Sequence, residues 1–178
     1  MLIKSLVLGI DLGTTGLRIA IINTKKQIVH TSSMPYSTGL EICEDWIYCL
    51  KKLIQEVPKD LKEKLVSCSV AGTSGTLLAC RNNGIPIGKA LPYFLSCSEY
   101  KNEIHKLFIE ECAGSSLSGS VGRALRLVAE YGDEIILRHQ ADWLSGWLLN
   151  NWEYGEEGNN IRMGWEVVNN SWPKKFQN

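Results

Sequence analysis

The chain has 178 residues, of which 44% are hydrophobic and 21% charged, so it can bury a sizeable core and is not intrinsically disordered. Its length predicts one domain or part of a larger one. The 19 basic and 19 acidic residues cancel, and no segment combines Lys or Arg with interleaved aromatic residues. The electrostatic footprint that nucleic acid requires is therefore missing, and small neutral or phosphorylated ligands fit the composition better.

The N-terminal segment and the cysteines bear on location. Between Lys4 and Asp11 there are only about five consecutive apolar residues, too few for a signal peptide or a membrane span. We therefore expect a cytoplasmic protein with no membrane partner. The six cysteines form no C-x-x-C pair, which predicts reduced, mostly packed thiols rather than a zinc site or a disulfide scaffold. The three histidines are isolated in sequence and are assigned no chemistry.

Three apolar runs open the chain, at residues 5–11, 17–23 and 28–34, separated by short turns that contain Gly or Lys. They predict a three-stranded antiparallel meander. From Glu44 onward, apolar residues recur at helical spacing until Pro58 ends the run, which predicts a helix. The expected order at the start of the chain is thus three strands followed by one helix.

The middle of the chain predicts a second group of strands. Residues 65–71 are β-branched and apolar and indicate a buried strand. Residues 76–80 and 85–87 flank an Asn-Asn-Gly turn that suits a hairpin. A short strand is expected at residues 135–137.

Helices are expected in the second half at residues 99–112 and 119–131. Asp142 is interpreted as the N-cap of a further helix that carries Trp143 and Trp147. These two tryptophans lie four residues apart, a spacing more typical of core packing than of sugar stacking. Beyond Asn150 the periodicity decays, which predicts loops or a hairpin.

The sequence Asp-Leu-Gly-Thr-Thr-Gly at residues 11–16 joins the first two predicted strands. Gly13 and Gly16 permit backbone conformations closed to other residues, so successive N–H groups can point into one concavity that suits phosphate oxygens. Thr14 and Thr15 add hydroxyl donors. Asp11, at the carboxyl end of the first strand, is placed to hold a hydrated Mg²⁺ beside nucleotide phosphates.

Other interpretations of this turn remain open. A Walker-type loop needs a Lys and a following helix, whereas here the Lys is missing and a strand follows; a dinucleotide-binding turn also leads into a helix and fails for that reason. An ordinary hairpin, with Gly for geometry and Asp11 in an Asx-turn, explains the same residues without any ligand. Arg18, on the second strand, is either solvated or reaches the phosphate region.

With the element order that follows it, this turn resembles the first phosphate motif of the superfamily of sugar kinases, heat-shock ATPases and actin. Within that superfamily the chain resembles the FGGY carbohydrate kinases over nearly its whole length, and most closely their cyanobacterial and plant xylulokinase-like branch. The segments that carry the resemblance are Asp45-Trp46, Gly-Thr-Ser-Gly at residues 72–75, the hairpin with Gly84, the Ser-rich residues 115–120, and Gln-Ala-Asp-Trp-Leu at residues 140–144.

The resemblance implies an α/β fold: a ribonuclease-H-like, actin-like ATPase lobe whose mixed sheet begins with the meander and is flanked by helices. It implies ATP as phosphate donor, Mg²⁺, and a keto-sugar such as ribulose or xylulose as acceptor. Asp11 would act as catalytic residue near the metal and the transferring phosphate. Gly13, Thr14, Thr15 and Gly16 would form the nucleotide site, with both threonines on the γ-phosphate.

The resemblance also implies that Ser74 and Gly75 contact the sugar, whereas the sequence without the resemblance favours a tight turn before a hairpin. Asn159, Asn160 and Arg162 fall where the family's lobe approaches the sugar, with a loose match. Residues 91–97 lack the Asp and Arg of the family's Trp-x-Asp-x-Arg-like segment, which leaves the identity of the sugar open.

The family's catalytic aspartate, second phosphate loop and adenosine pocket all lie later than residue 178. Residues 1–178 are therefore expected to be a truncated N-terminal kinase lobe, a poor catalyst alone, with a complementary C-terminal lobe as partner. Two other interpretations stand beside this one. The chain is a catalytically inactive sugar-binding or regulatory module derived from a kinase, or it is an ATPase of the actin or heat-shock type.

Overall fold

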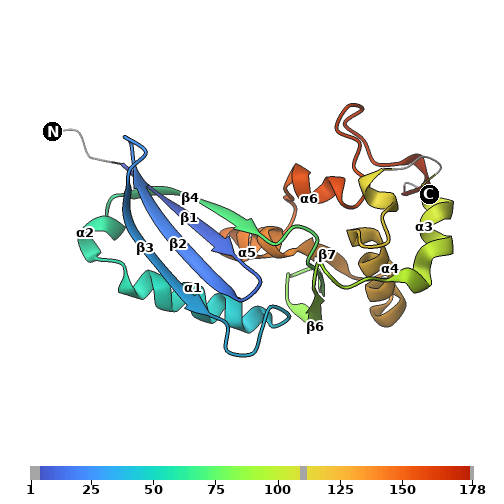
Figure 1. The fold of residues 1–178 in the computed structure, drawn as a ribbon, viewed down its shortest axis with the longest axis horizontal. Coiled ribbons are helices and arrows are strands. Elements are labelled where there is room, and N and C mark those ends of the chain that lie inside the picture. The colour runs from blue at the N-terminus through green and yellow to red at the C-terminus, as the bar shows by residue number, and fades with distance from the viewer. Residues whose placement is uncertain (1–4, 109–111, 177–178) are drawn as a thin grey trace. The chain divides into compact units, whose positions relative to one another are not determined.

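The computed structural model describes residues 5–108 and 112–176. The chain divides into two compact units, Met1–Thr73 and Ser74–Asn178, each with its own sheet and its own buried core (Figure 1). Within the described residues, no helix is long and apolar enough to cross a membrane.

The first unit is built on a four-stranded sheet of order β3-β2-β1-β4. Strands β1 (Leu6–Leu12), β2 (Gly16–Asn23) and β3 (Ile28–Pro35) form an antiparallel meander. Strand β4 (Leu65–Gly72) returns parallel to β1. The predicted meander is confirmed, and the mixed sheet has the topology expected from the sequence.

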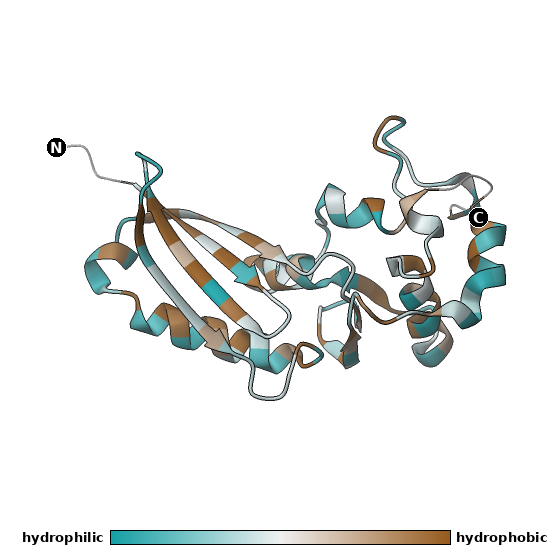
Figure 2. Cartoon of the chain, viewed as in Figure 1, coloured by the Kyte–Doolittle hydropathy of each residue, from teal (hydrophilic) through white to brown (hydrophobic). Residues whose placement is uncertain are grey.

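Alternation along the strands creates the core of this unit. Residues of β1 are alternately buried and partly exposed, as the period of two in a strand requires, and Figure 2 shows hydrophobic and hydrophilic residues alternating along the meander. Helix α1 (Cys43–Glu56) lies along one face and buries Trp46 and Leu53 completely. It ends just before Pro58, as predicted, and a short helix α2 (Lys59–Lys62) leads to β4.

Strand β4 lies where the sequence predicts a strand, but the prediction that it is buried is wrong. Five of its eight residues are exposed, and Val66 keeps 62% of its surface. In register, Cys68 lies beside Leu8, which is buried, yet Cys68 itself is exposed. The core beneath α1 therefore ends at β1. An apolar run predicts the strand, but whether anything covers the strand depends on elements distant in sequence.

The second unit contains a three-stranded antiparallel sheet of order β6-β5-β7. The predicted hairpin is confirmed as β5 (Leu77–Cys80) and β6 (Pro86–Leu91), and β7 (Ile136–His139) pairs with the other edge of β5. Helix α4 (Ser120–Tyr131) packs on β5. The buried residues of this contact are Leu77, Ala79, Ala124 and Leu127.

Shorter elements complete this unit. Helix α3 (Lys101–Leu107) follows the 3₁₀ turn Ser98–Tyr100 and is shorter than the predicted helix, because Phe108 adopts an extended conformation with φ −116° and ψ 119°. Residues 109–111 of that prediction lie outside the described residues. The other elements are the 3₁₀ turns Ala113–Ser115 and Lys174–Phe176, the helices α5 (Gln140–Leu149) and α6 (Glu157–Ile161), and an isolated bridge between Glu166 and Ser171.

The predicted N-cap at Asp142 is wrong. Helix α5 begins two residues earlier, at Gln140, and His139 occupies the cap position. Asp142 lies within the first turn, and its Oδ1 accepts hydrogen bonds from the backbone N–H of Glu156 at 3.0 Å and the side-chain amide of Asn159 at 3.3 Å. The carboxylate thus fixes a loop outside its own helix instead of capping it.

Candidate functional site

The turn between β1 and β2 is a tight hairpin. The N–H of Gly13 donates to the carbonyl of Gly16 at 2.9 Å, and the N–H of Tyr36 donates to the carbonyl of Thr15 at 3.0 Å. The first bond closes the turn, and the second ties it to the chain after β3. Because the Gly13 N–H is used inside the hairpin, it is not a donor for a ligand.

The predicted reason for the two glycines is wrong, since neither Gly13 nor Gly16 has a positive φ. Gly16 is needed for a different reason. A Cβ at this position would lie 2.4 Å from the carbonyl oxygen of Met34 and 2.8 Å from Cα of Pro35. The turn therefore uses glycine to let β3 approach closely rather than to reach a left-handed conformation.

Thr14 and Thr15 form the exposed tip of the turn. Within the described ranges, neither residue donates a backbone or hydroxyl hydrogen bond to another group. They line a hollow of about 310 Å³, together with Gly13, Gly16 and residues 33–35 at the end of β3. Two consecutive N–H groups and two hydroxyls at a hollow form a neutral, donor-rich surface that suits phosphate oxygens.

Asp11 and Arg18 lie directly opposite each other on β1 and β2. Nη2 of Arg18 is 2.6 Å from Oδ2 of Asp11, and Nε donates to the same oxygen at 3.0 Å. The side chain of Asp11 keeps 47% of its surface exposed and that of Arg18 keeps 66%. The pair is therefore solvated and contributes little to stability. Such a pair can open at low cost, which leaves the carboxylate free for a cation and the guanidinium free for a phosphate.

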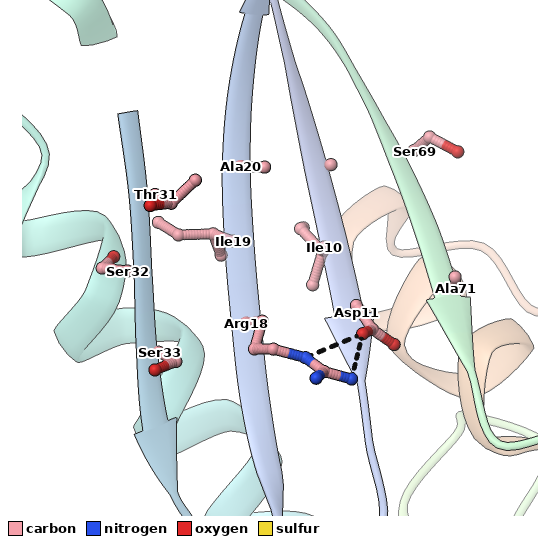
Figure 3. A pocket seen from close by; sticks show the side chains of 11 residues that line it. Ile10, Asp11, Arg18, Ile19, Ala20, Thr31, Ser32, Ser33, Ser69 and Ala71 are labelled. Atoms are coloured by element: carbon pink, nitrogen blue, oxygen red, sulfur yellow. Dashed lines mark hydrogen bonds and ion pairs between the residues drawn. The ribbon is translucent and has the colours of Figure 1, made fainter. Parts of the chain in front are cut away.

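Figure 3 shows this pair at one end of a concavity on the sheet face opposite α1. The concavity has a volume of about 630 Å³. Its floor consists of small residues, Gly9, Ala20 and Ala71, and hydroxyl groups stand along it on β3 and β4. Arg18 lines both this concavity and the hollow at the turn, so the two regions share one cation.

The residues present fit a bound Mg²⁺. Within residues 5–108 and 112–176, no three His, Cys, Asp or Glu side chains gather as a complete metal site. Mg²⁺ beside a nucleotide does not need such a cluster, because it retains several waters and takes one or two carboxylates plus phosphate oxygens. Asp11 supplies one carboxylate oxygen, Oδ1, that makes no hydrogen bond in the part of the chain described.

Asp45 in α1 stabilises the segment after β3. Its carboxylate accepts hydrogen bonds from the hydroxyl of Ser37 at 2.7 Å, from the hydroxyl and N–H of Thr38 at 2.5 and 2.7 Å, and from the N–H of Gly39 at 3.3 Å. Burial raises the pKa of Asp45, but these hydrogen bonds outweigh burial and lower the pKa to about 2. Because Tyr36 ties this same segment to the turn, Asp45 supports the hairpin indirectly.

Ser74 and Gly75, the predicted sugar contacts, belong to the second unit. Ser74 is exposed and Gly75 is buried. Gly75 has a φ of +94°, and a Cβ there would lie 2.9 Å from Nη2 of Arg123, so only glycine fits. The structure thus brings Asp11 and the hairpin turn together in one unit and Ser74 with Gly75 in the other.

Arg123 in α4 is a buried residue that the sequence analysis missed. Its side chain is 1% exposed and donates to the carbonyls of Gly75 and Leu95 at 2.8 Å and of Tyr93 and Ser118 at 3.1 Å. Burial lowers the pKa of Arg123. The guanidinium therefore fixes the turn at Gly75 against two other loops. No local pattern reveals this role, because the acceptors come from segments up to 48 residues away.

A buried polar chain lies in the same unit. Nε2 of His139 is 3.0 Å from the hydroxyl of Ser120, and Nδ1 is 3.7 Å from Oδ2 of Asp142. All three residues are at least 94% buried, so the arrangement is a structural network and not an accessible nucleophile. Asp142 also accepts a hydrogen bond from the side-chain amide of Asn159. Asn159 therefore joins this network. It is one of the three loosely matched residues, the others being Asn160 and Arg162.

Comparison with known proteins supports the fold. No protein-family profile matches the chain. Among solved structures, the chain superimposes on the Plasmodium falciparum glycerol kinase with ADP over 97% of its length, with a TM-score of 0.80 and 17% identity. It superimposes on the xylulose kinase from Bifidobacterium adolescentis over 97%, with a TM-score of 0.75 and 15% identity. It superimposes on the xylulose kinase from Rhodospirillum rubrum over 79% of its length, with a TM-score of 0.63 and 15% identity.

The chain has a sugar-kinase fold. The mixed sheet that begins with the meander belongs to this fold, as the sequence predicts. At these identities the similarity establishes architecture only, and it does not single out the cyanobacterial and plant branch. The chain spans 40% of the glycerol kinase and 42% of the Bifidobacterium xylulose kinase. It therefore corresponds to less than half of either kinase.

Proposed function

We propose that this chain supplies the first phosphate loop and part of the sugar site of an ATP-dependent carbohydrate kinase. The observation that carries the proposal is the hairpin turn, with two threonines at a hollow and Asp11 beside Arg18, on a sugar-kinase fold. The acceptor we infer is a hydroxyl of a keto-sugar of the ribulose or xylulose class. The setting is the cytoplasm, where ATP is available.

Each residue has a defined role in this proposal. The N–H groups and hydroxyls of Thr14 and Thr15 hold the γ-phosphate, with Gly13 and Gly16 shaping the turn. Asp11 releases Arg18 and holds a water or the metal itself, and Arg18 then turns to the phosphate. Mg²⁺, when bound, neutralises the negative charge on the transferring group. Ser74 donates a hydrogen bond to the sugar, and Gly75, with its φ of +94°, forms the turn that presents Ser74 to the sugar.

A complementary C-terminal lobe is part of the proposal, because phosphoryl transfer depends on groups positioned on both sides of the reacting phosphate. Such a lobe would provide the general base and the adenosine pocket. The alternative is an inactive sugar-binding or regulatory module. The exposed Asp11–Arg18 pair favours the kinase, because a pair held at the surface next to the turn has no evident structural role.

The test joins the chain to a C-terminal kinase lobe and measures ADP release with D-ribulose and D-xylulose. We expect Asp11→Ala to abolish sugar-dependent ADP release, with a loss of about 10²-fold or more, because it removes a charge next to the transferring group. Asp60→Ala, which removes an exposed carboxylate from α2, is the matched control and should keep full activity.

Retained activity in Asp11→Ala, with an unchanged unfolding temperature, would exclude Asp11 from the mechanism. Calorimetry on the isolated chain separates the two functions. Sugar binding that is weakened by Ser74→Ala, without any ADP release after the lobe is added, would establish the binding module instead.

A further inference from the structure

Three segments of the second unit that are distant in sequence meet at the side chain of Arg123. Nε donates to the carbonyl of Gly75 at 2.8 Å, and Nη2 donates to the carbonyl of Ser118 at 3.1 Å. Nη1 donates to two carbonyls of one loop, those of Tyr93 at 3.1 Å and Leu95 at 2.8 Å. Four of the five N–H donors of a guanidinium are thus bound to backbone, and each segment is tied to the other two through this group.

The burial and charge of Arg123 make these bonds strong. Its side chain is 1% exposed, and no carboxylate within residues 5–108 and 112–176 pairs with it. Hydrogen bonds from a charged donor are about twice as strong as neutral ones, and a buried cation that lost its acceptors would be strongly destabilised. Because the guanidinium is a planar fork with fixed donor directions, it holds the three segments in one arrangement.

The turn before β5 is buried at two residues and exposed at the third. Gly75 and Thr76 are buried, whereas Ser74 is exposed. The hydroxyl of Thr76 accepts a hydrogen bond from the N–H of Tyr93 at 3.1 Å. A Cβ on Gly75 would lie 2.9 Å from Nη2 of Arg123, so the guanidinium lies directly against this residue. The backbone next to Ser74 is therefore fixed from the buried side, and this sets the direction in which Ser74 is presented.

We propose that Arg123 is a positioning residue of the sugar site, which orients the hydroxyl of Ser74 toward the acceptor sugar by holding the Gly75 carbonyl and tying this turn to residues 93–95 and 118. This inference rests on the proposed function, in which Ser74 contacts the sugar, and deepens it by naming the group that sets the affinity of that contact. Arg123 is buried and does not contact the sugar itself. It acts through Ser74.

Replacement of Arg123 by Lys tests this role because the charge is kept. Lys has three donors on one nitrogen, which cannot reach carbonyls arranged around a planar fork. In the chain joined to a C-terminal kinase lobe, we expect Arg123→Lys to raise KM for D-ribulose or D-xylulose by about tenfold or more, because a displaced turn binds the sugar less well. KM for ATP should change by less than about twofold, since none of the four acceptors belongs to residues 11–16.

Arg126→Lys is the matched control, because Arg126 lies on the same helix and forms only a partly exposed ion pair with Glu99. Its KM for the sugar should not change. The kinetics are compared below the unfolding temperature of each variant. If Arg123→Lys does not fold, Arg123→Gln, which keeps a planar donor group without the charge, takes its place. Failure of both variants to fold would show that Arg123 serves the fold of the unit instead, and would overturn the assignment.

A double substitution shows whether Arg123 acts through Ser74. Ser74→Ala alone should raise KM for the sugar, because the hydroxyl is lost. Adding Arg123→Lys to Ser74→Ala should then raise KM by less than about threefold further, because no hydroxyl remains to be positioned. Effects of the two substitutions that multiply would mean that the residues contribute independently, which contradicts the proposal.

The same measurements separate this inference from the proposed function. An active joined protein whose KM for the sugar is unchanged by Arg123→Lys overturns the role of Arg123 and leaves the kinase. Calorimetry with D-ribulose and D-xylulose on the isolated chain covers the opposite case. If the joined protein releases no ADP while the isolated chain binds a sugar, the kinase is refuted, and the Kd of Arg123→Lys decides the role of Arg123. Absence of both turnover and sugar binding in the unsubstituted chain overturns both.

Discussion

Gly16 and Gly9 lie in the same pair of strands but differ in the space that a side chain would find. A Cβ on Gly16 would overlap backbone atoms of Met34 and Pro35, whereas a Cβ on Gly9 would meet only the carbonyl oxygen of Ala20, at an ordinary 3.7 Å. We expect Gly16→Ala to lower the free energy of unfolding by about 1–3 kcal/mol, because β3 must move. Gly9→Ala should change it by less than about 0.5 kcal/mol.

Amide hydrogen exchange in β1, β2 and β3, measured at increasing urea concentration, gives the stability of this unit in both variants; tryptophan fluorescence would combine Trp46 with the five tryptophans of residues 74–178. Similar effects of the two substitutions would show that the close approach at Gly16 is relaxed in solution. The comparison isolates sterics from backbone preference, because neither glycine has a positive φ.

At this scale the sequence predicts which residues meet in the turn but not how they interact. The placement of residues 11–16 between two strands follows from local pattern. The pairing of Asp11 with Arg18 follows once the register is known, since residues opposite each other in a ladder share a face. The contacts of Arg123 and of His139 with Ser120 could not be predicted, because they join residues that local periodicity does not connect.

At the scale of elements, Asp45 links α1 to the segment 37–39 by a charged side chain with a low pKa. In the unfolded chain this carboxyl has its ordinary pKa of about 3.9, whereas in the folded chain hydrogen bonds from Thr38 and Ser37 outweigh burial and keep it near 2. Its contribution to stability is therefore fully present above about pH 4 and is lost as the pH falls toward 2.

We expect Asp45→Asn to reduce the free energy of unfolding by about 1–2 kcal/mol at pH 7, because hydrogen bonds to a charged acceptor are lost. The difference from the unsubstituted chain should shrink between about pH 4 and pH 2. Glu44→Gln, at an exposed carboxylate in the same helical turn, is the control and should show little effect. Denaturation with urea across this pH range gives the answer, and a difference that does not depend on pH would contradict the assigned cause.

Sequence patterns predict the elements better than their surroundings. Pro58 stops α1 as expected, and the Asn-Asn-Gly turn produces the hairpin of β5 and β6. The cap at Asp142 is predicted wrongly because the sequence does not show that Glu156 and Asn159 compete for its carboxylate. Burial of β4 is predicted from composition alone, and composition does not reveal that α1 covers the sheet only as far as β1.

At the scale of the molecule, local patterns predict the meander and the helix, and the resemblance carried by residues 11–16, 72–75 and 140–144 predicts the sugar-kinase fold. The parallel pairing of β4 with β1 joins strands distant in sequence, so no local pattern predicts it. The division at Thr73 is not encoded locally either. Residues 72–75 indicate a turn, and a turn inside one domain looks the same as a turn between two units. Each unit nevertheless has its own core: Leu8, Ile10 and Trp46 in the first, Leu77, Ala79 and Leu127 in the second.

Because the two cores are separate, a substitution that destabilises one unit should leave the stability of the other unit unchanged. Arg123→Met leaves four carbonyl groups of the second unit without their buried donor, so we expect it to cost about 3 kcal/mol in that unit. Amide hydrogen exchange should become faster in β5, β6 and β7 and stay unchanged in β1 and β2. Arg126→Met, on the same helix, removes only a solvated ion pair with Glu99 and should change exchange far less. Faster exchange in both sheets after Arg123→Met would instead show that the two units unfold as one cooperative structure.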